Sequence, residues 1–186
     1  MTVTSPQARA AHPPARQELA AFEAIFVQYY TRVYAVVFRL VGDQAEADDL
    51  TLETFWKLWQ QPPTQADNLA GWLYRVASRL GYNALRAAKR RGRYEEAAWD
   101  ALEPSALPDP AGEAERGAER ARVRAALARM PERDAQLLVL RYSGLSYREI
   151  AAALGVSPNS VGTLLARAEA EFEKVYSEGD SHAHQR

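Results

Sequence analysis

The chain has no cysteine, and this absence removes several kinds of chemistry. Without thiols there are no disulfide bonds, no thiolate zinc sites and no cysteine nucleophiles, and nothing points to an oxidising compartment. Histidine is scarce as well, because all three, His12, His182 and His184, lie close to the two ends. Chain ends are commonly loose, so we expect these histidines to have no metal-binding or catalytic role and the chain to need no cofactor.

Long apolar runs are also missing. No segment approaches the roughly 20 consecutive apolar residues that a bilayer-crossing helix needs, and residues 1–18 lack the apolar core of a signal peptide. We therefore expect a cytoplasmic location, no direct contact with a membrane, and disordered tails at residues 1–18 and 177–186.

Helical periodicity is abundant. With 186 residues, 47% of them hydrophobic, the chain can bury one ordinary core or two small ones. Apolar residues recur at intervals of three and four from Phe22 to Leu40, and Gly42 ends that helix. A second helix follows the capping residue Asp43 and stops at Pro62. Patterns of this kind along the chain predict an all-α fold.

The second predicted helix is apolar on two faces. One face carries Leu50, Thr54 and Leu58, and the other is broad and aromatic, with Leu52, Phe55, Trp56 and Trp59. One face can serve the core of the domain, and the other is either also buried or offered to a partner. We expect one of the pair Phe55 and Trp56 to be a core residue.

A third helix is predicted to open after Asp67 or Asn68 and to run to about Arg91 without any acidic residue, although the formal net charge of the chain is only −1. Helical geometry separates its side chains into two neighbouring arcs. The arc expected to pack comprises Leu69, Leu73, Val76, Leu80, Ala84 and Ala87. The basic and aromatic arc beside it comprises Trp72, Arg75, Arg79, Tyr82, Asn83, Arg86 and Arg90.

The basic and aromatic arc suits opened DNA better than closed duplex. Arginine binds phosphates with release of counterions, and exposed rings stack on unpaired bases. Tyr74 lies well off this arc, so we expect it to be a core residue.

Beyond this first unit, residues 19–93, the composition changes. Residues 94–118 are rich in acids, alanine and proline and predict a flexible linker. Residues 119–176 return to helical patterns, and Ser146 with Glu149 forms a capping box before a helix that turns at Gly155. Ser157 then caps a new helix whose first residue is Pro158. This pattern indicates a helix-turn-helix, with a helical hairpin that binds nothing as the alternative. The start of its second helix, where side chains meet base edges, carries Pro158, Asn159, Ser160 and Thr163.

Three segments in order resemble the extracytoplasmic-function sigma factors, the small two-domain group of bacterial transcription initiation factors. "DDLTLETFWKLW" is similar to their core-polymerase-binding segment, "AGWLYRVASRLGYNALRAAKRR" to their segment for the minus-ten element, and "MPERDAQLLVLRYSGLSYREIAAALGVS" to their minus-thirty-five domain. The likeness covers about Phe22 to Arg93 and Val123 to Tyr176. It implies two helical domains, sigma regions 2 and 4, on either side of the linker.

The resemblance also implies partners: core RNA polymerase through its beta-prime and beta subunits, promoter DNA, and an anti-sigma factor. It places polymerase binding on Asp49, Leu50, Glu53, Phe55 and Trp56. The basic and aromatic arc of the third helix would open the minus-ten element. Minus-thirty-five binding falls on Arg141, Ser146, Arg148, Ser157, Pro158, Asn159, Ser160, Thr163 and Arg167.

The chain departs from the family pattern at several of these places. Arg79 stands where an asparagine is common, and Leu52 where a glutamine is common. Positions often basic in the recognition helix are occupied by Gly162, Leu164 and Glu169. Either the minus-thirty-five contact is weak and depends on Arg141, Arg148 and Arg167, or the second domain docks differently.

Two other classes of function remain open on the sequence. A conventional helix-turn-helix regulator would explain the second unit equally well, but not the basic and aromatic helix of the first. An enzyme would need catalytic or metal-binding groups, and the acids Asp48, Asp49 and Glu53 have no histidine or further carboxylate clustered with them. We therefore expect a protein that is not an enzyme.

Overall fold

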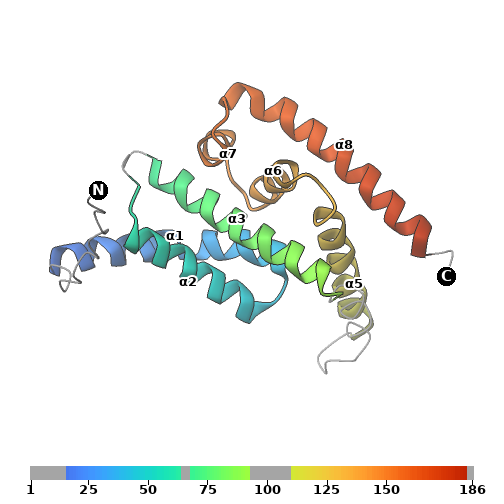
Figure 1. The fold of residues 1–186 in the computed structure, drawn as a ribbon, viewed down its shortest axis with the longest axis horizontal. Helices are drawn as coiled ribbons and strands as arrows, with labels where there is room; N and C mark the ends of the chain where they lie inside the picture. Colours follow the sequence, from blue (N-terminus) through green and yellow to red (C-terminus); the bar gives the residue numbers. More distant parts are fainter. Residues whose placement is uncertain (1–15, 64–67, 93–109, 184–186) are drawn as a thin grey trace, which may run out of the picture.

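The structure, a computed structural model, describes residues 16–63, 68–92 and 110–183. Every regular element within these ranges is an α-helix, as the sequence predicts. In chain order they are α1 (Arg16–Val41), α2 (Gln44–Gln60), α3 (Leu69–Arg90), α5 (Pro110–Leu127), α6 (Glu132–Tyr142), α7 (Tyr147–Leu154) and α8 (Pro158–Ala183) (Figure 1). None of the described helices is both long enough and apolar enough to cross a bilayer.

The predicted helix ends are confirmed where a side chain or a glycine marks them. The Asp43 carboxylate accepts a hydrogen bond from the main-chain N–H of Glu46 at 2.8 Å and caps α2. Ser146 and Glu149 form the capping box at the start of α7. Gly155 ends that helix with φ of 66°, a left-handed conformation that costs glycine little.

Three ends differ from the sequence expectations. The first helix begins at Arg16, inside the expected tail. α5 begins at Pro110, inside the expected linker 94–118, and α8 runs to Ala183, past the expected end of the second unit. The stretches 1–15, 93–109 and 184–186 of the expected tails and linker lie outside the described residues.

The helices form two groups that share one continuous core. In the first group α1, α2 and α3 pack on one another, with Val33, Val37 and Leu40 of α1 fully buried. In the second group α5, α6 and α7 pack against α8. Figure 1 shows α6 and α7 lying between α3 and the long α8, and both contact α3. The first and second units therefore touch along α3.

The packed arc of α3 differs from the predicted one. Of the six residues expected to pack, only Leu73 is buried, and the other five are partly buried. The residues that are buried are Gly71, Leu73, Tyr74, Ala77, Ser78, Gly81, Tyr82, Leu85 and Ala88. Small residues dominate because α1 approaches closely: a Cβ on Gly81 would lie 2.8 Å from Cδ1 of Leu40. The predicted arc was wrong because it was drawn through large aliphatic side chains, whereas the buried side of α3 includes glycine, alanine and serine.

Candidate nucleic-acid and polymerase interface

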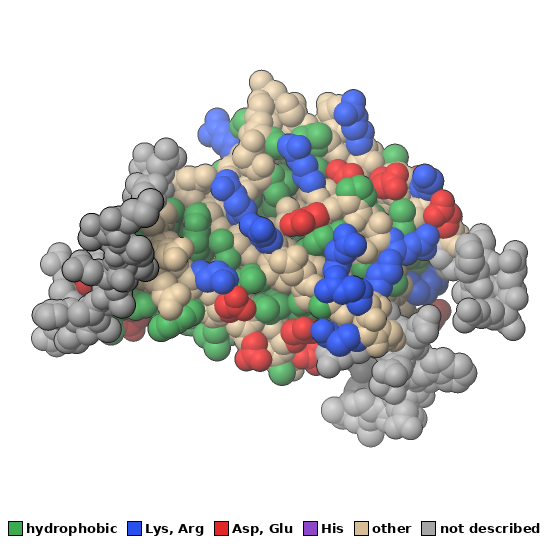
Figure 2. Space-filling model, viewed as in Figure 1, with side chains coloured by type: hydrophobic (Ala, Val, Ile, Leu, Met, Phe, Trp, Pro, Cys, Tyr) green, Lys and Arg blue, Asp and Glu red, His purple; other side chains and the backbone are tan. Residues whose placement is uncertain are grey.

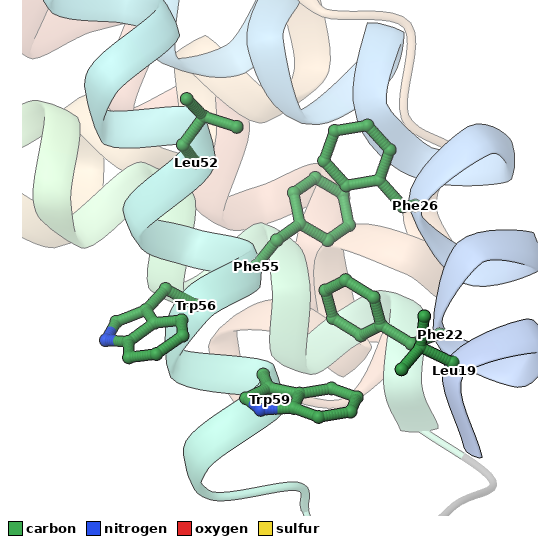
Figure 3. Close-up of a pocket in the computed structure, with 7 residues that line it drawn as sticks. All are labelled: Leu19, Phe22, Phe26, Leu52, Phe55, Trp56 and Trp59. Atoms are coloured by element: carbon green, nitrogen blue, oxygen red, sulfur yellow. The ribbon is translucent and has the colours of Figure 1, made fainter. Parts of the chain in front are cut away.

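An apolar groove of about 460 Å³ runs between α1 and α2. Figure 3 shows the side chains of α2 on one side of it and those of α1 on the other. They are Leu19, Phe22, Phe26, Leu52, Phe55, Trp56 and Trp59. Phe26 packs on Phe55 with ring centroids 4.7 Å apart, and Phe22 meets Trp59 edge to face at 5.1 Å. The second helix thus presents its aromatic face to the groove.

Phe55 and Trp56 both line the groove but differ in burial, as expected. Phe55 is 2% exposed and belongs to the core, whereas Trp56 is 57% exposed. An exposed indole beside an apolar groove is a feature typical of binding surfaces. Of the other residues assigned to polymerase binding, Asp49 is exposed, Leu50 is partly buried, and Glu53 pairs with Lys57 at 3.1 Å.

Most of the basic arc of α3 is open to solvent. Arg75, Arg79, Asn83, Arg86 and Arg90 are exposed, and Trp72 is partly buried against the core. Figure 2 shows lysine and arginine side chains gathered over the end of α3 near α5. Their assignment to melted DNA stays a prediction.

The cations at this end of α3 are close enough to affect one another. Partial burial lowers the pKa of Lys89, and the charges of Arg129 and Arg86 lower that pKa further. Arg129 comes from the segment that joins α5 to α6, so the cationic surface is built from both units. A bound anion would relieve this repulsion.

Tyr82 does not lie where the sequence predicted. It is 1% exposed, and its hydroxyl donates a 2.6 Å hydrogen bond to the main-chain oxygen of Met130. Burial raises the pKa of the Tyr82 phenol, which keeps it a hydrogen-bond donor. In this arrangement the ring is unavailable for stacking on a base, because the second unit covers this side of α3. Tyr74, by contrast, is fully buried as expected.

Arg75 is exposed, yet it also contacts the second unit. Its Nε donates to the main-chain oxygen of Ala153 at 2.6 Å, and its Nη2 to that of Ala152 at 3.0 Å. Both oxygens belong to the last turn of α7. The sequence analysis predicted that this guanidinium binds DNA, whereas in the structure it hydrogen-bonds to the main chain of α7.

The helix-turn-helix surface is open. All nine residues assigned to the minus-thirty-five element are exposed: Arg141, Ser146, Arg148, Ser157, Pro158, Asn159, Ser160, Thr163 and Arg167. The guanidinium of Arg141 lies 5.5 Å from the centre of the Tyr147 ring. No group of three or more metal-ligating side chains that could hold a metal ion occurs within the described residues.

Sequence reasoning missed the residues that join the two units. Arg32 of α1 pairs with Glu149 of α7 at 3.1 Å across 117 positions of sequence, and no local pattern marks such a pair. The side chain of Asn68 does not cap α3 and donates to the main-chain oxygen of Ala152 at 3.3 Å. Gly71 is the one signal in the sequence that could have indicated this contact, because a glycine inside a helix commonly marks a place where another backbone packs closely. A Cβ at Gly71 would lie 2.9 Å from the carbonyl carbon of Ala152.

Comparison with known proteins follows the same two-unit division. The family model described as "Sigma-70 region 2" matches residues 25–91, and "Sigma-70, region 4" matches residues 120–172. The first match spans α2, α3 and most of α1, and the second spans the helix-turn-helix.

Several curated relatives are described as ECF RNA polymerase sigma factors. The ECF RNA polymerase sigma factor SigE of Mycolicibacterium smegmatis is 30% identical over 173 residues, 90% of this chain and 66% of that protein. SigL of Mycobacterium tuberculosis is 27% identical over 155 residues, 81% of this chain and 86% of that protein. The chain spans only 26% of SigJ and 50% of SigG from Mycobacterium tuberculosis.

A solved structure shares the fold. The sigma factor RpoE of Bartonella quintana, solved in complex with the anti-sigma factor NepR, superposes with a TM-score of 0.51 at 20% identity. The match covers 84% of this chain and 97% of that one. With both regions matched in order and relatives of a single description, the chain belongs to the sigma-70 family, in its extracytoplasmic-function group.

Proposed function

We propose that this protein directs bacterial core RNA polymerase to promoters and helps to open them. One observation carries the proposal: a single chain holds an apolar groove, an exposed arginine face on α3 and an exposed helix-turn-helix. The first suits a protein partner, the second suits phosphates of melted DNA, and the third suits the major groove of a duplex. Few functions need all three surfaces.

Residues 19–93 would hold polymerase and the minus-ten element in this proposal, and residues 119–176 the minus-thirty-five element. The groove would receive a helical segment of the beta-prime subunit, with Trp56 as the main anchor. An anti-sigma factor would compete for the same groove, since the Bartonella relative was solved with such a partner. The protein would act in the cytoplasm, without catalysis of its own.

Run-off transcription with purified core polymerase tests this function. The full chain should produce transcripts from a subset of promoters, its own among them, that core polymerase alone does not produce. Absence of any dependent transcript would refute the proposal.

A variant of α3 makes the test specific for promoter opening. Arg79→Ala should reduce open-complex formation on duplex promoter, and the defect should shrink on a template with a premelted bubble. Both arginines are exposed, but Arg79 is chosen because Arg75 also bonds to α7. Arg120→Ala, at an exposed position of α5, is the matched control.

The second candidate function, a conventional regulator, is favoured by the intact helix-turn-helix alone. A regulator shifts promoter duplex by itself, whereas a sigma factor of this group needs core polymerase. An electrophoretic shift with and without core polymerase separates the two.

A further inference from the structure

The ring of Tyr147 connects two helices of the second unit. Tyr147 is the first residue of α7 and is 44% exposed. A Cβ on Gly162 of α8 would lie 3.7 Å from Cε2 of this ring, which is an ordinary van der Waals distance. The ring is therefore seated on α8 at the position of Gly162.

Gly162 borders the surface predicted to read bases. Residues three and four positions apart share one face of a helix, so Gly162 lies on the same side of α8 as Asn159 and Pro158. Both of these residues are exposed at the start of the helix. Gly162 itself offers no cation to DNA, and the Tyr147 ring lies beside it.

A cation lies over the same ring. The guanidinium carbon of Arg141, in the last turn of α6, is 5.5 Å from the centre of the Tyr147 ring. The chain reverses between α6 and α7 with Gly144 at φ of 85°, and this turn brings the ring back to the end of α6. A guanidinium within about 6 Å of a ring centre is attracted to the face of the ring.

Arg141 keeps its hydrogen-bond donors available. Arg32, Arg122 and Arg129 each pair with a glutamate. By contrast, no carboxylate pairs with Arg141 within the part of the chain that the structure describes. An aromatic ring attracts the charge of a guanidinium but does not take up its N–H groups as a carboxylate does. The N–H groups of Arg141 can therefore still bind an anion.

We propose that Tyr147 is a positioning residue for the minus-thirty-five element: its ring, seated on α8, holds the guanidinium of Arg141 for contact with a DNA phosphate beside the recognition helix. The inference rests on the proposed function, because it assigns a role within the same surface. A long side chain that is already oriented loses less conformational entropy when it meets its ligand. Tyr147 acts on DNA through Arg141 and not by direct contact.

NMR of the free full-length chain tests the arrangement without polymerase or DNA. Ring currents move protons over an aromatic face upfield, so the side-chain Hδ and Hε signals of Arg141 should lie upfield of ordinary arginine values. Tyr147→Phe keeps the ring and should keep these shifts. Tyr147→Leu keeps an apolar side chain against Gly162 but has no ring, and it should return the signals to ordinary values. Signals that do not move in Tyr147→Leu would overturn the arrangement.

Salt titration of promoter binding, with the full-length chain bound to core polymerase, tests the role. Each phosphate contact contributes about 0.9 to the slope of log affinity against log salt, so Arg141→Ala should flatten the slope by about 0.9. Tyr147→Leu should also flatten it, and Tyr147→Phe should leave it unchanged. The double variant, Arg141→Ala with Tyr147→Leu, should be no flatter than Arg141→Ala alone, because both changes remove one contact.

Two controls make this result specific. Tyr142→Leu removes a tyrosine that is 62% exposed at the end of α6, and it should leave the slope unchanged. Any loss from Arg148→Ala, at an exposed position next to the ring, should add to that of Tyr147→Leu. Additive losses from Arg141→Ala and Tyr147→Leu would overturn the positioning role. A defect in Tyr147→Phe as large as that in Tyr147→Leu would overturn it as well, because the hydroxyl would then be the group that matters.

The two measurements separate this inference from the proposed function. Upfield Arg141 signals in a chain that binds no promoter with core polymerase would refute the proposed function and leave the Arg141–Tyr147 arrangement standing. Normal promoter binding with an unchanged slope in Tyr147→Leu would refute the positioning role and leave the proposed function standing.

Discussion

Two buried tyrosines of α3, Tyr74 and Tyr82, differ in the hydrogen bonding of their hydroxyl groups. The Tyr82 hydroxyl donates to Met130, whereas no hydrogen bond to the buried Tyr74 hydroxyl is found among the residues that the structure describes. Tyr82→Phe should lower the free energy of unfolding by about 1 kcal/mol, because a buried hydrogen bond is lost and a carbonyl is left unpaired. Tyr74→Phe should be neutral or slightly stabilising. Denaturant titration of both variants checks this, and equal losses would contradict it.

Phe55 and Trp56 are adjacent but should respond in opposite ways. Phe55→Ala opens a cavity in the core and should destabilise the protein by about 3–5 kcal/mol. Trp56→Ala removes an exposed ring and should leave the unfolding midpoint nearly unchanged while it weakens binding to core polymerase. Thermal unfolding and a polymerase pull-down together test the pair. A large loss of stability in Trp56→Ala would show that its indole supports the fold.

Glu149 should make the protein sensitive to acid. Its partial burial acts to raise its pKa, but hydrogen bonds from the main chain and hydroxyl of Ser146, and the nearby Arg32, outweigh burial and lower it. A lowered carboxyl pKa contributes stability above the ordinary glutamate pKa of about 4.3, and this contribution disappears as the pH falls through the lowered value.

Glu149→Gln should flatten the acid limb of stability against pH, because glutamine keeps a capping side chain but does not titrate. Arg32→Ala, which leaves the capping box in place, should flatten it less. Unfolding midpoints measured from neutral pH down to about pH 3 decide this. Parallel curves for wild type and Glu149→Gln would contradict the assignment.

At the scale of elements, α8 carries few basic residues on the side expected to face DNA, because Gly162, Leu164 and Glu169 occupy positions that are often basic in the family. Each phosphate contact contributes about 0.9 to the slope of log affinity against log salt. Gly162→Lys or Glu169→Arg should therefore steepen this slope by about one unit for the full-length protein bound to core polymerase on promoter duplex, and equally on scrambled duplex, because phosphate contacts carry no sequence information. A gain confined to one sequence would place the DNA-facing side of α8 elsewhere.

The beginnings and ends of the elements could largely be predicted, because they depend on local chemistry. Asp43, the Ser146–Glu149 box and Gly155 act on residues within four positions, so their effects are visible in the sequence. The buried side of α3 could not be predicted from large residues alone. Its packing depends on how closely α1 and α7 approach, and glycine, alanine and serine set that distance.

At the scale of the whole molecule, the sequence supported two helical units but not their association. The composition of residues 94–118 predicted a flexible linker, and nothing in the sequence predicted that the two units pack on each other. The groups that join them, Arg75 and the carbonyls of α7, are a side chain expected on DNA and main-chain atoms that carry no sequence information. For the same reason Tyr82 was misplaced: its partner is a carbonyl 48 residues away.

The order of α3 and α7 along the chain has a consequence for protein synthesis. Sixty-four residues separate the last residue of α3, Arg90, from the last residue of α7, Leu154. At ribosomal rates of about 5–20 residues per second, roughly 3–13 s pass between the completion of the two helices. Each newly made chain therefore exists for several seconds with Arg75 unable to reach its partners on α7, and these contacts form only after Leu154 has been synthesised.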